Sequence, residues 1–165
     1  MPMSSDVYGK ILVPYDGSKH SCKALDHAIA IAKAGKSRSE VVLLHVVSAY
    51  PDYHFVERPA RSIRTGEKTT LSRYLVEVNE FMKQNAEDAL AKEKEETRLS
   101  SNFEIKTAAL SGPIAQTIFE YATRHKVDLI VIGSIGRSGL SKLRTLGSVS
   151  RSVSERAPCP VMIVH

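Results

Sequence analysis

The chain has 165 residues, of which 42% are hydrophobic and 25% are charged, so its composition is that of a globular protein and excludes wholesale disorder. The length is close to the roughly 150 residues of an average domain, and we therefore expect one domain over residues 1–165. A net charge of +5 suits an anionic ligand, whereas the lack of Trp and an aromatic content of 6% make a nucleic-acid partner an unfavoured hypothesis.

The first third of the chain predicts a strand, a helix and a second strand. A short apolar run at residues 10–14 ends in a turn sequence and is typical of a buried strand. The next residues predict a helix that Ser18 or Ser21 caps and that Gly35 ends, with its apolar positions on one face. The continuous apolar run Val41–Val47 then predicts a strand buried on both faces, as in a parallel sheet.

The middle of the chain begins with a segment of different composition. Pro51–Thr70 is rich in Pro, Ser, Thr and Arg, and we expect a long, flexible loop of about 20 residues there. A charged helix with an apolar stripe is predicted from Leu71 to about Arg98. A strand over Phe103–Leu110 follows, and Gly112-Pro113 opens the next helix.

The last part of the chain completes an alternation of strands and helices. It holds a predicted strand over Asp128–Gly133, a helix over Ser148–Arg156 and a strand over Pro160–Val164. The order predicts an α/β domain with an open, five-stranded parallel sheet. In such sheets ligands bind beyond the carboxyl ends of the strands. The segments that end there are residues 14–18, 46–49, 111–113 and 133–148.

The sequence carries no sign of a membrane span, a signal peptide or a cysteine-based site. No apolar run approaches the roughly 18 residues of a span, and residues 1–10 lack an apolar signal core. Cys22 and Cys159 lie far apart, which argues against a disulfide framework and a zinc site. We therefore expect a soluble, cytoplasmic protein without a membrane partner.

A glycine-rich segment after the fourth predicted strand is the strongest candidate for a binding site. Gly133, Gly136, Gly139 and Gly147 lie in it, and Gly147-Ser148 opens a helix. Glycines let a backbone approach a ligand closely, and a helix N-terminus offers N–H groups and a positive dipole end. Residues 129–154 hold no Asp or Glu but several Arg and Lys. The segment therefore predicts a phosphate site, with an ordinary basic loop as the alternative.

The glycine spacing matches neither the GxxxxGK[ST] loop nor GxGxxG after the first strand. Gly133–Ser150 instead resembles the universal stress protein family, whose nucleotide-binding members carry G-x2-G-x9-G-[ST]. The segments Lys10–Ser18, Val41–Val46 and Cys159–Val164 resemble that family's first, second and closing strands, so the resemblance covers nearly the whole chain. One departure is that ten residues, not nine, separate Gly136 from Gly147, and we expect the extra residue within 138–145.

The resemblance implies a Rossmann-like fold of the adenine nucleotide alpha hydrolase type, with strand order 3-2-1-4-5 and helices on both faces. It implies ATP as the ligand, with Mg²⁺ or Mn²⁺ held through the phosphates. Adenine would lie near Val46 and Pro14, ribose near Asp16 and Gly133, and the phosphates on the glycine segment. The nucleotide-binding residues so implied are Pro14, Tyr15, Asp16, Val46, Ile132, Gly133, Gly136, Arg137, Gly147, Ser148 and Val149.

The resemblance further implies a homodimer through the last strand, Pro160–His165, whose edge would otherwise stay unpaired. Two functions remain open: an ATP-binding stress-response or signalling module with slow or no turnover, and a hydrolase or transferase acting at the phosphates. Residues 134–154 hold no carboxylate, histidine or side-chain amide to orient a water, which favours a binder without catalytic residues. His54 or Glu57 of the predicted loop could supply such a group.

Two further residues have competing interpretations. Asp16 stands in a turn after a strand, so it is either a turn or N-cap carboxylate or a group near the ribose or a metal. His45 interrupts a buried strand, and a hydrogen-bonded core histidine is the simpler interpretation than a catalytic base.

Overall fold

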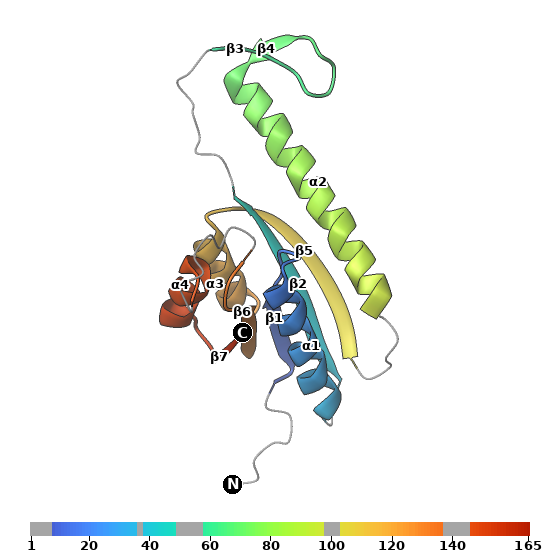
Figure 1. Ribbon diagram of the computed structural model, residues 1–165, viewed down its shortest axis with the longest axis vertical. Coiled ribbons are helices and arrows are strands. Elements are labelled where there is room, and N and C mark those ends of the chain that lie inside the picture. Colours follow the sequence, from blue (N-terminus) through green and yellow to red (C-terminus); the bar gives the residue numbers. More distant parts are fainter. Residues whose placement is uncertain (1–7, 36–37, 49–57, 98–102, 137–145) are drawn as a thin grey trace.

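A central parallel sheet organises the molecule (Figure 1). The computed structural model describes residues 8–35, 38–48, 58–97, 103–136 and 146–165. The sheet's strands are β1 (Lys10–Pro14), β2 (Ser39–Ser48), β5 (Phe103–Gly112), β6 (Leu129–Gly133) and β7 (Val161–Val164), in the order β5-β2-β1-β6-β7. All four neighbouring pairs are parallel. Counted within this sheet the order is 3-2-1-4-5, so the prediction of an open five-stranded parallel sheet is confirmed.

Two pairs of helices cover the two faces of this sheet (Figure 1). These helices are α1 (Lys19–Ala34), α2 (Leu71–Thr97), α3 (Ile114–Arg124) and α4 (Ser148–Arg156). Successive side chains of a strand point to opposite faces, so each buried strand feeds two cores. Ile11 and Val13 pack with buried residues of α1 and α2. Leu12 packs with buried residues of α3 and α4. The predicted cover of both faces by helices is confirmed.

The start of α1 is determined by a side-chain cap next to the sheet's carboxyl edge. The Ser21 backbone N–H donates to Ser18 Oγ at 3.2 Å, so Ser18 rather than Ser21 is the N-cap. Asp16 stands two residues before this cap, and its Oδ1 accepts a hydrogen bond from the Ser18 N–H at 3.0 Å. These two contacts position the first turn of α1 directly after β1.

Residues 58–70 differ from the prediction. They form an antiparallel hairpin of β3 (Pro59–Arg61) and β4 (Lys68–Thr70), so the prediction of a loop is wrong for this part of Pro51–Thr70. Residues 51–57 lie outside the described part. The Ser62 hydroxyl and the Ile63 N–H both donate to Glu77 Oε2 at 2.9 Å. The hairpin turn is thus held by a helix that follows it in the chain.

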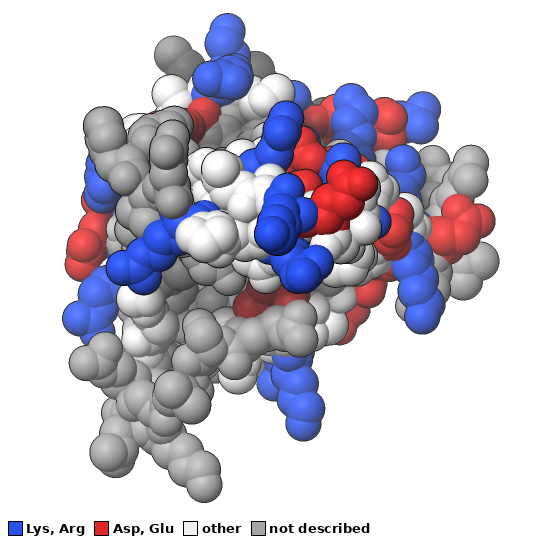
Figure 2. All heavy atoms as spheres, turned by 90° about the horizontal axis from the view of Figure 1, so that it is seen from above, with Lys and Arg blue, Asp and Glu red and all other residues white. Residues whose placement is uncertain are grey.

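The helix α2 is long and only part of it rests on the sheet. Ala86 and Leu90 of its second half are buried against the sheet. Its first half extends beyond the strand ends and carries the β3–β4 hairpin (Figure 1). Seen from above, this end of the molecule groups Lys and Arg side chains near its middle, with Asp and Glu beside them (Figure 2). Within the described ranges, no helix combines the length and the apolar content that crossing a membrane requires.

Candidate functional site

A cavity of about 370 Å³ lies at the carboxyl ends of the central strands, within the range of small-ligand sites. Ten of the predicted site residues line it, which are Pro14, Tyr15, Asp16, Val46, Ile132, Gly133, Gly136, Gly147, Ser148 and Val149. Arg137, the eleventh, lies outside the described residues. The structure thus brings together segments from four separate parts of the sequence, while their binding of a nucleotide stays a prediction.

The cavity has a continuous apolar wall. Leu44, Ile118 and Ile132 line it and belong to the buried core between the sheet and the α3–α4 face. Val46 and Ile114 line it beside them, partly buried against the same core. A wall of aliphatic side chains is a surface against which an aromatic ring system can be buried favourably.

The polar part of the cavity depends on a close approach between two segments. Gly136 follows β6, and a Cβ built on it would lie 2.8 Å from Asp16 Oδ2, which follows β1. A Cβ on Gly133 would lie 2.7 Å from the backbone of His20 in α1. Any side chain at either glycine would therefore displace Asp16 or the first turn of α1, so both positions require glycine for space.

The N-terminus of α4 opens onto the cavity without a side chain over it. Gly147 is the N-cap and provides no side-chain hydrogen bond, and the first turn holds no acidic residue. Ser148 and Val149 of that turn line the cavity. The first N–H groups of a helix have no partner within the helix and carry the positive end of its dipole. This end of the cavity is therefore suited to an anion.

A buried hydrogen-bond cluster holds α4 against the end of β6. The Gly147 N–H donates to the Ser134 carbonyl at 2.7 Å. The Ser150 hydroxyl donates to the same carbonyl at 2.8 Å and lies 3.1 Å from the Gly147 carbonyl. Since Ser134 and Ser150 are almost fully buried, these bonds position the α4 N-terminus with little freedom.

Asp16 serves as a turn carboxylate and also lines the cavity. Its Oδ1 accepts the Ser18 N–H, which is the turn role considered from the sequence. Its Oδ2 lies beside Gly136, so the side chain also reaches the cavity. The two interpretations of this residue are compatible in one geometry.

Tyr15 connects the cavity to α2. Its hydroxyl donates to Glu93 Oε2 at 2.7 Å and lies 3.4 Å from Cys22 Sγ. Burial of the phenol, together with its hydrogen bonds to Cys22 and Glu93, raises the pKa of Tyr15 well above its ordinary value. The tyrosine therefore stays protonated and acts as a hydrogen-bond donor.

One candidate from the sequence, His45, lies away from the cavity, and others fall outside the described residues. His45 is half-buried within β2 and does not line the cavity. His54 and Glu57 lie outside the described residues, as do the residues 138–145 that contain the expected extra position. Within the described ranges, no three His, Cys, Asp or Glu side chains gather as a metal site.

Eight lining residues were not in the predicted set. They are Ser18, Ser21, Leu44, Ile114, Ile118, Ile135, Leu146 and Ser150. Ile114 and Ile118 stand one helical turn apart directly after the end of β5, which is a sequence signal for a helix face at the sheet's carboxyl edge. The residues on the inward side of that helix could therefore have been included among the predicted site residues. Ser150 is held at the cavity by hydrogen bonds from its hydroxyl to the backbone carbonyls of Ser134 and Gly147, and the sequence carries no signal for such bonds.

Comparison with known proteins gives the same result as the geometry of the fold. Residues 8–165 match the sequence pattern of the universal stress protein family. The universal stress protein MJ0531 of Methanocaldococcus jannaschii is 37% identical over 161 residues, covering 96% of this chain and 83% of that protein. The structure of the universal stress protein UspA from Lactobacillus plantarum has a TM-score of 0.77 at 26% identity and covers 96% of this chain and 98% of its own.

A more distant solved structure, at 23% identity and a TM-score of 0.62, is a universal stress protein in complex with cAMP; the match covers 96% of this chain and 97% of that one. At this level of identity the likeness concerns the fold. An adenine nucleotide is thus held by a protein of this architecture.

Proposed function

The chain belongs to the universal stress protein family, and from this premise we propose that it binds ATP in the cavity and works as a stress-response or signalling module. One observation carries the proposal. The aliphatic wall, the Asp16–Gly136 approach and the uncapped N-terminus of α4 line a single cavity at the carboxyl edge of a parallel sheet. That edge is where open α/β sheets bind their ligands.

The cavity offers each part of a nucleotide a surface of matching chemistry. Adenine lies against Val46 and the neighbouring aliphatic side chains, with Pro14 and Tyr15 at the end of β1. Asp16 and Gly133 take the ribose, since a carboxylate oxygen accepts hydrogen bonds from hydroxyl groups. The phosphates lie on Gly136 and on the first turn of α4 from Gly147 onward.

A divalent cation fits this arrangement only as a companion of the phosphates. Asp16 is the single carboxylate among the described lining residues, and one of its oxygens already accepts the Ser18 N–H. We propose that Mg²⁺ or Mn²⁺ is held mainly by phosphate oxygens, where it would neutralise their charge. Arg137 belongs to the proposed phosphate contacts on the basis of its position in the sequence.

The same residues favour binding over turnover. Phosphoryl transfer requires a positioned nucleophile together with metal and charge stabilisation. The described lining residues supply amides, hydroxyls and one carboxylate, and no histidine or side-chain amide. We propose at most a slow ATPase, and fast hydrolysis or transfer at the phosphates is the alternative that kinetics would reveal.

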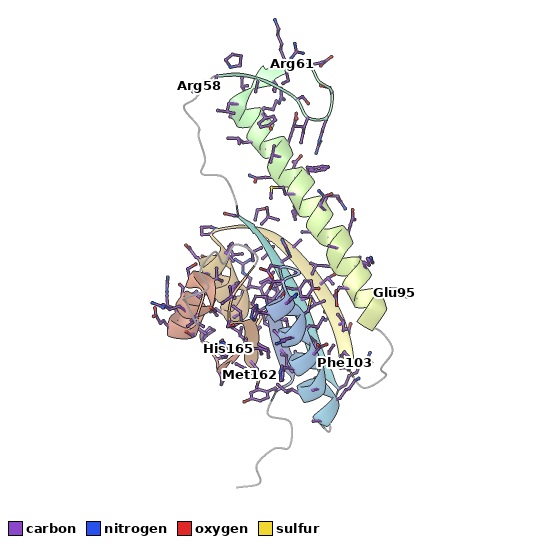
Figure 3. The ribbon with its side chains drawn as sticks, in the orientation of Figure 1. Arg58, Arg61, Glu95, Phe103, Met162 and His165 are labelled. Carbon is purple, nitrogen blue, oxygen red and sulfur yellow. The ribbon has the colours of Figure 1, made fainter. Side chains whose placement is uncertain are left out.

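We propose further that the chain forms a homodimer through Pro160–His165. In the described part of the chain β7 pairs on one side only, with β6, and Met162 is exposed on it. Figure 3 shows Met162 and His165 in the lower part of the molecule, far from the hairpin end of α2. An apolar edge strand invites pairing with a copy of itself. The backbone groups of residues 160, 162 and 164 face β6, so Ile163 is the residue whose N–H faces the free edge. Ile163→Pro should therefore give a monomer by light scattering, and a wild-type monomer at micromolar concentration would contradict the dimer.

Calorimetry with Mg-ATP tests the central proposal. The wild-type protein should bind, and Gly147→Val should abolish binding because a branched side chain would cover the α4 N-terminus and meet the Ser134 carbonyl, 3.2 Å from the Cβ position. Gly9→Ala is the matched control, because its Cβ would make only an ordinary contact at 3.5 Å, remote from the cavity. Absence of binding by the wild-type protein would refute the proposal.

A further inference from the structure

Exposed apolar side chains concentrate on one projecting part of the chain. We call residues 58–97, which comprise β3, β4 and α2, the arm. Of the large hydrophobic side chains that are exposed in the described part of the chain, all but Met162 lie on the arm. They are Ile63, Val76, Phe81 and Met82. Clusters of exposed apolar side chains on a small protein mark interaction surfaces.

Phe81 points away from the sheet. It precedes Leu90 by nine residues, which at about 100° per residue places the two side chains on opposite sides of α2. Leu90 is 1% exposed against the sheet, whereas Phe81 is 59% exposed. The Ile63 N–H bonds to Glu77, one helical turn before Phe81, so the hairpin turn borders the same outer side. Phe81 is therefore an exposed aromatic side chain on the outer side of the arm, near the middle of α2.

The charges of the arm are segregated along its length. Residues 58–76 hold five basic and one acidic side chain, whereas residues 77–97 hold seven acidic and three basic ones. The basic side chains of the first part are Arg58, Arg61, Arg64, Lys68 and Arg73. Figure 3 shows Arg58 and Arg61 at the hairpin end and Glu95 near the other end of α2. Local pairs such as Arg64–Glu80, at 2.6 Å, leave the net charges of +4 and −4 unchanged.

We propose that the arm is a second interface between two copies of this chain, in which two α2 helices pack antiparallel with Phe81 close to the two-fold axis. Such an axis places the basic part of each arm against the acidic part of the other. It brings residue 73 of one copy opposite residue 89 of the second, so Arg73 lies next to Asp88 of the second copy. Both side chains are exposed in the single chain.

A second copy of the arm presents an opposite net charge to each of the two charged parts of the first arm, and it does so with one surface. Within one chain the hairpin reaches back to Glu80 through its pair with Arg64, while the rest of α2 continues away from it in a helix of 27 residues, about 40 Å long. An acidic partner of another kind would match the net positive charge of residues 58–76 but not the net negative charge of residues 77–97. The two-fold contact also covers Phe81 with its own copy, as isologous interfaces do.

This interface is independent of the proposed nucleotide site and of the proposed β7 contact. The strand β7 forms one edge of the sheet, and α2 packs mainly on β5 at the opposite edge. A chain with two different two-fold contacts assembles into a closed tetramer or an open filament, depending on the angle between the axes. If either the arm contact or the β7 contact is removed, the assembly becomes a dimer held by the remaining contact.

Sedimentation velocity over a concentration range tests the arm, with each variant also made in the Ile163→Pro background, because the backbone N–H of Ile163 faces the free edge of β7 and proline removes it. We expect that background to keep a concentration-dependent dimer and Phe81→Glu to abolish it. Phe81 is exposed, so folding is unaffected, as circular dichroism would verify. The control Ser72→Glu lies nine residues before Phe81, on the opposite side of α2, and should leave the dimer intact.

A charge exchange identifies the partner. Arg73→Glu and Asp88→Arg should each weaken the dimer about fivefold, since each pair occurs twice, and the double variant should restore the wild-type affinity. Raising NaCl to about 0.5 M should weaken the dimer by screening. An unchanged dimer of Phe81→Glu in the Ile163→Pro background, an absence of dimer in that background alone, or an effect of Arg73→Glu without recovery in the double variant would each overturn the proposal.

Discussion

The Tyr15 hydroxyl donates a 2.7 Å hydrogen bond to Glu93 Oε2 and so links the end of β1 to α2. Tyr15 lines the cavity, while Glu93 stands on the last part of the helix that carries the hairpin. The bond crosses 78 positions of sequence. It gives α2 an attachment at the carboxyl edge of the sheet in addition to its apolar contacts through Ala86 and Leu90.

Tyr15→Phe should lower the free energy of unfolding by about 1–2 kcal/mol, because a part-buried carboxylate loses a donor. Urea denaturation measures the change. Tyr121→Phe is the control, since Tyr121 is also partly buried but has no side-chain hydrogen bond among those of the described residues. A loss of equal size in both variants would show that the Tyr15–Glu93 bond adds nothing beyond the phenol itself.

The same tyrosine makes stability sensitive to alkaline pH. Burial and the bonds to Cys22 and Glu93 hold the pKa of Tyr15 in the folded state above the roughly 10 of an unfolded chain. The unfolded state therefore releases this proton first, and the contribution of Tyr15 is present below pH 10 and lost as the pH rises above it. The stability difference between wild type and Tyr15→Phe should shrink accordingly above pH 10.

A second pH dependence should come from Glu40 at the other end of the sheet. Burial of this carboxyl opposes its ionisation, but hydrogen bonds and charges of Lys106 and Lys10 outweigh that effect and lower the pKa of Glu40. A lowered pKa gives stability that is present above the unfolded value of about 4.3 and lost as the pH falls through the folded one.

Glu40→Gln should therefore reduce the free energy of unfolding at pH 7 by about 0.5–1 kcal/mol and have almost no effect near pH 2. Thermal unfolding at both pH values measures this, with Glu155→Gln on α4 as the control for an exposed carboxylate on another element. An equal effect at both pH values would contradict the role of the two lysines.

Gly136→Ala should weaken ATP binding about 10- to 100-fold, since the added methyl group must push Asp16 Oδ2 out of a 2.8 Å approach. Calorimetry measures the affinity, and Gly9→Ala provides the control for a glycine whose Cβ has room. Unchanged affinity in Gly136→Ala would mean that the ligand does not depend on the carboxylate's place in the cavity.

Elements whose formation depends on residues close together in the sequence can be predicted from it, whereas features that depend on contacts between distant segments cannot. The central residues of β1 and β6 are continuous apolar runs, so the local sequence predicts that both faces of these strands are buried. The helix from Leu71 was predicted for the same reason, because its apolar stripe repeats along one face. These local signals are sufficient to predict the sheet and its covering helices.

The hairpin and part of the cavity depend on contacts that no local pattern encodes. The turn from Ser62 to Gly66 is held by Glu77, which follows it by fifteen positions, so its composition alone resembles a loop. The place of Gly136 beside Asp16 follows from the adjacency of β6 and β1, which the family resemblance implied and periodicity did not. The lining by Ser150 arises from its bond to the Ser134 carbonyl.

The remaining prediction concerns turnover. Bound ATP should stay largely intact in a single-turnover assay with labelled ATP and Mg²⁺ or Mn²⁺, at a rate well below the roughly 1–10³ s⁻¹ of ordinary enzymes. The reason is that the described lining residues include amides and hydroxyls to hold phosphates, while their single carboxylate, Asp16, is placed by the Ser18 N–H rather than aimed at a water.

A double variant, His54→Ala with Glu57→Gln, removes the groups outside the described residues that could act as a base. Turnover at enzymatic rates that disappears in this variant would make segment 51–57 catalytic and replace the binder with a hydrolase. Turnover that survives it but disappears in Asp16→Asn would instead assign the chemistry to the carboxylate beside Gly136.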